Sequence, residues 1–443
     1  MRKIAKNTYQ TTSRSEENTS EFTMLIILFF IKHLQLFLPI YVSFIPNTHI
    51  VMKRIFIIFI AISSIFVQNS FSQSIKVAAE LTEEYLPLLE GKRVGVVANP
   101  TSCVGKTHLI DTLLAKGIDV KSIFCPEHGF RGQAEAGAAI NSEIDSKTGL
   151  PIISLYGKNK KPTAEQLKTI DVMVFDIQDV GARFYTYIST LHYVMEAVGQ
   201  SNLHLIVLDR PNPNGFYVDG PILQAEHKSF VGMHPVPIVH GLTIGEYAQM
   251  INGEAWLANG ITCNLTVIKM QNYTHDSLYH LPIAPSPNLQ TPNAIYLYPS
   301  ICCFEGTNVS VGRGTKTPFE VVGSPTFNCN NNETYTFIPK PIKGVSENPM
   351  HNGKQCKGLD LRGKGYNIIK TKQLDLSYLI TMYKCGGSSK FFNSFFEKLM
   401  GTSELRKQIE NGIPENEIRA SWQPQLNEYK TIRKKYLLYP DFE

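Results

Sequence analysis

The sequence predicts an α/β fold in which a doubly wound parallel-sheet domain is followed by a smaller α+β domain. Between residues 92 and 211, short apolar runs alternate with helix-like stretches. The runs are continuously apolar, as in parallel strands that are buried on both faces. Five prolines fall within 281–300 and indicate a junction there. A chain of 443 residues has the usual length for two domains, which we place at 73–280 and 281–443.

Five runs are expected as parallel strands: 94–98, 120–125, 152–156, 172–177 and 203–208. Helices are expected between and after them: 107–116, 163–169, 185–198 and 243–258. The last begins at Thr243, and Glu246 three residues later fits a capping box. This alternation places helices on both faces of one sheet.

Residues 52–72 have the layout of a secretory signal peptide. Lys53 and Arg54 precede an apolar run that is too short to span a bilayer comfortably. No cysteine follows it to carry a lipid, so we expect no stable membrane anchor after cleavage. Residues 1–51 are a doubtful extension, with a first membrane segment as the alternative reading. The body is therefore expected to be periplasmic or secreted.

The charge of the body gives no reason to expect nucleic-acid binding. The whole chain carries +5, but residues 73–443 hold 36 positive and 35 negative side chains. The eight cysteines include no CxxC pair. One or two disulfides are compatible with export, but their connectivity cannot be read from the sequence, and neither can the oligomeric state.

Polar and titratable residues follow each expected strand, at 99–101, 126–129, 156–157, 178–179 and 209–212. Open α/β sheets bind ligands beyond the carboxyl ends of their strands. A cleft is therefore expected at this edge of the sheet.

The segment 126–132 places Glu127, His128 and Arg131 among glycines. The end of a buried strand can desolvate a carboxyl group and keep it protonated, as an acid catalyst requires. The alternative is a solvent-exposed loop with a surface ion pair.

The segment 176–187 combines hydrogen-bonding groups with aromatic rings, which suits a sugar. Its candidate binding residues are Gln178, Asp179, Arg183, Tyr185 and Tyr187. The alternative is a strand, a helix cap and a tyrosine pair that packs inward.

Further candidates lie later in the chain: Asp209, Arg210, Asn212, His240, Glu305, Asn308 and Arg313. A metal site built from His128, Asp179, Asp209 and His240 is an alternative, but none of their spacings is typical of ligands. We therefore expect no metal. A complete P-loop, GxGxxG, GxSxG and HExxH are absent from the sequence, so no cofactor is expected either.

Taken together and in order, these strings resemble the exo-β-N-acetylmuramidase family typified by NamZ. The matching stretches are 94–101, 125–132, 175–187, 208–212, 240–246, 285–288, 304–308, 311–315, 418–424 and 434–442. The resemblance covers residues 85–443. It implies a Rossmann-like larger domain, a smaller C-terminal domain and a cleft between them. It also implies a secreted or periplasmic glycoside hydrolase that releases N-acetylmuramic acid from the non-reducing ends of peptidoglycan fragments.

The resemblance makes Glu127 the leading catalytic carboxylate, and we expect it to act as general acid beside His128. Glu305 is the first choice for the second carboxylate, with Asp179 and Asp209 as rivals. The 2-acetamido group of the substrate is an alternative nucleophile, so the stereochemistry stays open.

Muramic acid carries a lactyl carboxylate, which a guanidinium can bind with two hydrogen bonds. The candidate guanidinium groups belong to Arg131, Arg183, Arg210 and Arg313, and the stretch 285–288 adds Asn288 as a binding residue. A non-catalytic protein that binds muramyl sugars in the same cleft is the main alternative function. A metal-dependent hydrolase of another cell-wall bond is a third.

Overall fold

The computed structural model describes residues 74–127, 129–130, 143–329, 334–386 and 390–443. Residues 74–443 belong to one compact unit. The doubtful extension 1–51 and the expected signal peptide 52–72 lie outside the described residues.

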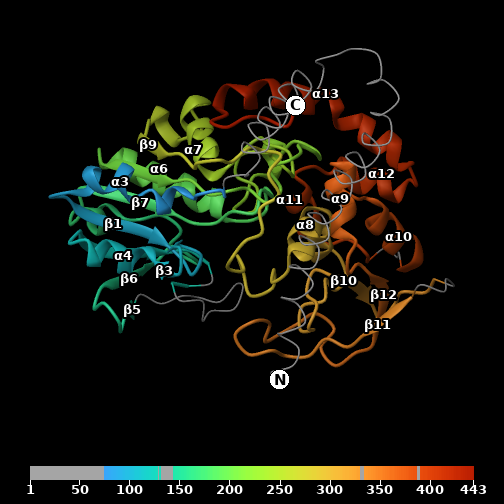
Figure 1. Cartoon of the computed structure of the whole chain (residues 1–443). Helices are drawn as coiled ribbons and strands as arrows, with labels where there is room; N and C mark the ends of the chain where they lie inside the picture. The colour runs from blue at the N-terminus through green and yellow to red at the C-terminus, as the bar shows by residue number, and fades with distance from the viewer. Residues whose placement is uncertain (1–73, 128, 131–142, 330–333, 387–389) are drawn as a thin grey trace, which may run out of the picture. The chain divides into compact units, whose positions relative to one another are not determined.

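The larger part contains a seven-stranded sheet in the order β5-β6-β4-β1-β7-β8-β9 (Figure 1). Every neighbouring pair is parallel except β5 with β6. The strands are β1 (Arg93–Ala98), β4 (Asp119–Cys125), β5 (Glu143–Ile144), β6 (Pro151–Ser154), β7 (Val172–Asp176), β8 (His204–Leu208) and β9 (Asn264–Ile268). All five expected strands are confirmed within a few residues of their predicted ends.

Helices cover both faces of this sheet. Successive side chains of a strand point to opposite faces, so one strand packs against helices on both sides. Val94 and Val96 pack with α3 (Thr82–Leu89) and α4 (Leu109–Ala115). Val97 packs into the other cluster. The helices of that face are α5 (Ala164–Leu167), α6 (Tyr187–Gln200) and α7 (Ile244–Gly253). The doubly wound α/β fold is confirmed.

Helix α7 begins at its predicted capping box. The Thr243 hydroxyl accepts from the Glu246 backbone N–H, and the Glu246 carboxylate accepts from the Thr243 N–H at 2.8 Å. The helix ends at Gly253, five residues before its predicted end. Ala255 has a φ of 53°, outside the helical region, and this conformation stops the helix early.

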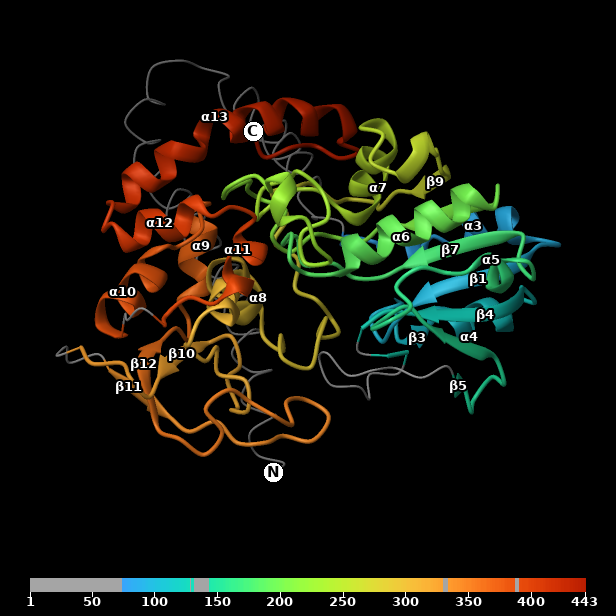
Figure 2. The same cartoon turned by 180° about the vertical axis from the view of Figure 1, so that it is seen from behind.

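The smaller part contains a three-stranded antiparallel sheet, β10-β12-β11, beside helices α8 to α13 (Figure 2). Its strands are β10 (Val321–Ser324), β11 (Tyr335–Phe337) and β12 (Cys356–Asp360). Its helices are α8 (Pro292–Ile301), α9 (Gly365–Thr371), α10 (Ser377–Gly386), α11 (Ser394–Met400), α12 (Glu404–Glu410) and α13 (Glu415–Arg433). A disulfide joins Cys329 to Cys385. Within the described ranges, no helix combines the length and the apolar character that crossing a membrane requires.

Candidate active site

A cavity of about 420 Å³ lies between the carboxyl edge of the large sheet and the smaller part. Its lining residues are Glu127, Tyr156, Phe184, Tyr185, Thr186, Tyr187, Phe230, Val231, Ser286, Leu289, Tyr298, Cys302, Glu305, Arg313, Phe319, Ser346, Asn348, Pro349, Met350, Phe395 and Leu399. The volume is in the range of small-molecule sites.

The topology explains why this edge is hollow. Strands β4 and β6 lie on one side of β1, whereas β7 and β8 lie on the other. Loops that leave β1 and β7 therefore diverge, and a crevice opens between them. Glu127 follows β4, Tyr156 follows β6, and Thr186 precedes α6. The segments that follow β4, β6 and β7 thus supply one wall of the cavity.

Glu127 is partly buried and is held by hydroxyl groups. Thr186 Oγ1 donates to Glu127 Oε2 at 3.2 Å. The Tyr156 hydroxyl also forms a hydrogen bond with Glu127. Burial, then the charge of Glu127, raises the pKa of Tyr156 above its usual value, so this phenol stays protonated and is able to donate.

Glu305 lies in the 3-10 helix η5 (Cys302–Gly306) of the smaller part and is held at both oxygens. Arg313 Nε donates to Oε1 at 2.6 Å, and the Cys302 thiol donates to Oε2 at 3.7 Å. Burial alone would lower the pKa of Arg313, but attraction to Glu305 and the hydrogen bond between them raise it above the ordinary arginine value. The cavity therefore contains a charged guanidinium group that is paired with Glu305.

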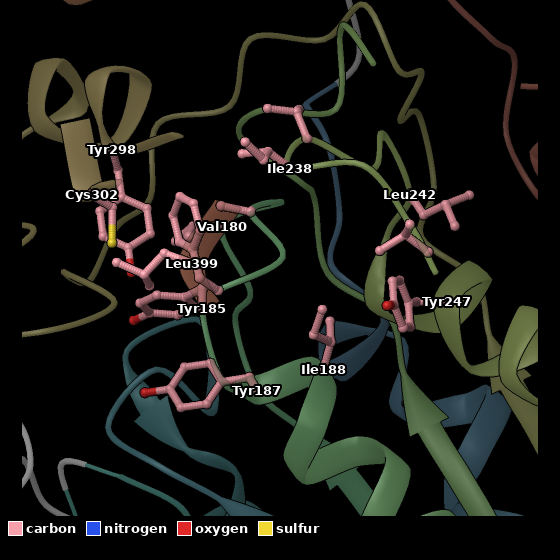
Figure 3. Packing of buried hydrophobic residues seen from close by; sticks show 14 of the residues in the cluster. Val180, Tyr185, Tyr187, Ile188, Ile238, Leu242, Tyr247, Tyr298, Cys302 and Leu399 are labelled. Carbon is pink, nitrogen blue, oxygen red and sulfur yellow. The ribbon is translucent and has the colours of Figure 1, made fainter. Parts of the chain in front are cut away.

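Aromatic rings share the cavity lining with the two glutamates. Figure 3 shows three of them, Tyr185, Tyr187 and Tyr298. The rings of Tyr185 and Tyr187 meet edge to face, with centroids 4.8 Å apart, and Tyr298 lies 5.7 Å from Tyr185. The Tyr185 hydroxyl donates to the Pro285 carbonyl at 2.7 Å. Burial raises the pKa of both Tyr185 and Tyr187, so their hydroxyl groups stay neutral. This surface offers ring faces and edges with few charges.

Several candidates in 176–183 lie in the interior and do not line the cavity. Gln178 donates to the carbonyls of residues 179 and 211, and Asp179 accepts from the Gly181 N–H at 2.7 Å. Arg183 is fully buried, and its amino groups donate to the carbonyls of residues 221, 236 and 399. These side chains hold backbone segments together and are not part of the cavity lining.

The candidates between 209 and 240 also lie outside the cavity lining. Asp209 is fully buried; burial raises its pKa to about 7, against hydrogen bonds from Tyr439, Thr243 and Gly245. Arg210 is paired with Asp176 through two hydrogen bonds. Asn212 donates to the Leu242 carbonyl.

The His240 ring accepts from the Leu242 N–H through Nδ1. Its Nε2 lies 3.7 Å from Asp179 Oδ2. Within the described ranges, no three His, Cys, Asp or Glu side chains are grouped so that they could hold a metal ion together.

Asn288 and Asn308 flank the cavity without lining it. Asn288 Nδ2 donates to the Val345 carbonyl at 2.9 Å, and the backbone carbonyl of Asn308 accepts from His351 Nε2 at 2.8 Å. Both therefore contact a neighbouring loop. His128 and Arg131 lie outside the described residues. Glu127, Tyr185, Tyr187, Glu305 and Arg313 are thus the sequence candidates that the structure brings together in one cavity.

Sequence reasoning missed several lining residues. Tyr156 and Thr186 each lie at a strand end or within a motif that the sequence singles out, so their positions carried a signal. Ser346, Asn348 and Met350 lie in an irregular segment with no periodic pattern or motif. No feature of the sequence pointed to them.

Comparison with known proteins gives one consistent result. Residues 94–293 match the family model described as exo-β-N-acetylmuramidase NamZ, N-terminal, and residues 296–439 match its C-terminal counterpart. The chain is 40% identical over 375 residues to the peptidoglycan β-N-acetylmuramidase NamZ of Bacillus subtilis strain 168. That alignment covers 81% of this chain and 90% of the relative.

Two crystal structures of DUF1343 family proteins from Bacteroides fragilis are similar to this fold. The first has a TM-score of 0.77 and 47% identity, and covers 83% of this chain and 100% of its own. The second has a TM-score of 0.70 and 30% identity, with coverages of 82% and 99%.

Proposed function

The chain belongs to the exo-β-N-acetylmuramidase NamZ family, and from this membership we propose that it releases N-acetylmuramic acid from the non-reducing ends of peptidoglycan fragments. The observation that carries the proposal is the presence of two glutamates, Glu127 and Glu305, in one cavity lined by aromatic rings. Glycoside hydrolysis generally uses two carboxyl groups on either side of the scissile bond.

Glu127 is the general acid in this proposal. It donates a proton to the glycosidic oxygen as the bond from that oxygen to the anomeric carbon breaks. Water supplies the hydroxyl group of the released sugar and the proton that restores the acid. The hydroxyl of Thr186, which can donate or accept, is able to hold Glu127 in place before and after it loses its proton.

Glu305 is the second carboxylate. As the bond breaks, positive charge develops at the anomeric carbon, and a fixed negative charge near this carbon stabilises the transition state. The contacts of Glu305 with Arg313 and Cys302 fix the direction of both its oxygens. A carboxylate that is already oriented need not reorganise when the charge appears.

Arg313 is the group that selects muramic acid. In the described part of the chain its Nε is committed to Glu305, whereas its two terminal amino groups have no hydrogen-bond partner. These groups can bind a carboxylate with two parallel hydrogen bonds. The lactyl carboxylate distinguishes N-acetylmuramic acid from N-acetylglucosamine, so in this proposal the contact with Arg313 discriminates between them.

We also propose that the protein acts in the periplasm or outside the cell. The sequence pattern at 52–72 supports export. The disulfide between Cys329 and Cys385 supports it independently, because disulfides form and persist mainly in oxidising compartments.

Two substrates test the proposal on the purified protein: a nitrophenyl β-N-acetylmuramide and the disaccharide N-acetylmuramyl-N-acetylglucosamine. Nitrophenolate leaves without protonation, whereas a sugar alcohol requires it. The Glu127→Gln variant should therefore lose roughly 1000-fold in rate on the disaccharide and far less on the nitrophenyl substrate. The Glu305→Gln variant should lose activity on both.

Glu226→Gln, at an exposed glutamate outside the cavity lining, is the matched control and should behave as wild type. The nitrophenyl glucosaminide should be a poor substrate, and activity should survive a chelator. Near-normal rates in the Glu127→Gln variant on the disaccharide would remove Glu127 from the mechanism. Tight binding of muramyl sugars by the wild type without any release would instead identify a binding protein.

A further inference from the structure

The cavity wall opposite the sheet includes an irregular loop, residues 342–351, which we name the cavity loop. Ser346, Asn348, Pro349 and Met350 from this loop line the cavity. The first turn of the loop is closed by reciprocal backbone hydrogen bonds between Ile342 and Ser346, at 2.8 and 2.9 Å. The loop therefore has its own internal hydrogen bonds, and four of its residues line the cavity.

Two hydrogen bonds join the cavity loop to Asn288 and Asn308, which lie in motifs that the sequence singles out. Asn288, which is 1% exposed, donates from Nδ2 to the Val345 carbonyl at 2.9 Å. At the other end, His351 Nε2 donates to the carbonyl of Asn308 at 2.8 Å. These hydrogen bonds give the Asn288 side chain and the backbone of Asn308 a role that needs no direct contact with substrate.

A third constraint acts at Pro349, near the end of the loop. Gly314 adopts a φ of +79°, and a Cβ added there would lie 2.7 Å from the Cβ of Pro349 and 2.6 Å from the Lys340 carbonyl oxygen. Only glycine allows this backbone conformation and this close approach together. Gly314 directly follows Arg313, so the chain that carries the guanidinium also fixes the position of Pro349.

Asn348 immediately precedes this fixed proline, and its side chain is exposed in the cavity. In the described part of the chain, the Asn348 amide has no hydrogen-bond partner. An amide offers two donors and an acceptor, which matches the hydroxyl and acetamido groups of a sugar. A polar group that is exposed on a constrained loop loses little entropy when it binds a ligand.

We propose that Asn348 is a substrate-binding residue that hydrogen-bonds the amino sugar in the cavity, and that Asn288, Asn308 and Gly314 position it through the cavity loop. The assignment rests on the proposed function for the identity of the sugar. It extends that function by adding a substrate-binding side chain from a segment that no sequence motif had indicated. Asn348 takes no part in proton transfer, so its contribution is to affinity.

The test compares wild type with Asn348→Ala and Asn352→Ala. Asn352 is an exposed asparagine four residues later that does not line the cavity, which makes it a matched control. Kinetics on the nitrophenyl muramide should show KM raised about 10-fold by Asn348→Ala with kcat within about 2-fold, since one neutral hydrogen bond is lost. Asn352→Ala should leave both constants unchanged.

Calorimetric titration with free N-acetylmuramic acid separates this proposal from the catalytic one, because it requires no turnover. The Kd should rise about 10-fold in Asn348→Ala and remain unchanged in Asn352→Ala. Gly314→Ala should reproduce the weaker binding by displacing Pro349. An unchanged KM and Kd in Asn348→Ala would overturn the assignment, even if the glutamate variants behave as expected. If the wild type releases no sugar, the Kd comparison still decides the role of Asn348.

Discussion

Tyr439 donates a hydrogen bond to Asp209 Oδ2 at 2.6 Å and so ties the end of the chain to the end of strand β8. Asp209 also accepts from the Thr243 hydroxyl and from the N–H groups of residues 210 and 245. One buried carboxyl group thus joins the sheet, the start of α7 and the C-terminal segment. The residue that the sequence offered as a rival catalytic carboxylate is instead a structural junction.

Tyr439→Phe should therefore destabilise the fold. The variant removes one of four donors to a buried carboxyl group, which costs about 1–3 kcal/mol in the free energy of unfolding. Denaturant titration would measure this loss. Tyr436→Phe is the matched control, because the Tyr436 hydroxyl bonds Glu254 at a half-buried position and its loss should cost less. Equal stabilities for the two variants would contradict the junction role of Asp209.

Thr186→Val should lower activity without loss of stability. Valine keeps the shape of threonine but cannot donate to Glu127 Oε2. We expect kcat/KM on the disaccharide to fall about 10-fold, the equivalent of one hydrogen bond. Thr190→Val is the control, since its hydroxyl bonds the Thr186 carbonyl within α6 and does not reach the cavity. A larger loss in Thr190→Val would refute a specific role for Thr186.

The sheet could be predicted because each central strand is a continuous apolar run between turn residues. The edge strand β9 could not, since Asn264 and Thr266 interrupt its apolar character and only its last residue is buried. Helix α7 began where its capping box placed it, but Ala255 ended it at a backbone conformation that side-chain patterns do not reveal.

The edge of the sheet that carries the site could also be predicted, because parallel strands bring their carboxyl ends together. Which polar side chains face the cavity could not. Gln178 and Arg183 look like ligand-binding residues in the sequence, yet both satisfy backbone carbonyls in the interior. These carbonyls belong to irregular segments that are distant in sequence. A local sequence pattern does not reveal that they need a donor.

Arg183 and Arg313 should respond differently when each is replaced by methionine. Arg183→Met leaves the carbonyls of Pro221 and Leu399 without donors and should cost about 3 kcal/mol or more of stability, with muramide preference unchanged in the folded fraction. Arg313→Met should remove the preference for the muramide over the glucosaminide. The ratio of kcat/KM values for the two substrates and the denaturation midpoint measure the two effects. If only Arg183→Met lost the preference for the muramide, the lactyl carboxylate would be bound by Arg183 and not by Arg313.

The stability of the protein should fall as the solution is acidified from pH 6.5, because two buried histidines must remain neutral. His192 Nδ1 and His234 Nε2 lie 2.9 Å apart and share one proton in a hydrogen bond. His234 also stacks on Trp256 and bonds the Tyr247 hydroxyl.

Burial, aided by Lys228 and Lys161 and opposed by Glu196, lowers the pKa of His192 to about 4. Burial and the neighbouring His192 lower that of His234 well below its usual value. Both histidines therefore take up protons on unfolding at mildly acidic pH. Their contribution to stability is complete above the unfolded pKa near 6.5 and is lost as pH falls towards the folded values.

For His192, the loss between pH 7 and pH 5 should be about 2 kcal/mol. Denaturant titrations at both pH values should show that His192→Gln reduces this difference, whereas His227→Gln, at a residue outside the pair, leaves it intact. The segment that follows Phe230 carries His234, and Phe230 itself lines the cavity and is bonded to Ser189 of the same helix as His192. Both histidines therefore lie in elements that also support the cavity wall. An identical pH difference in wild type and His192→Gln would show that the pair does not control acid stability.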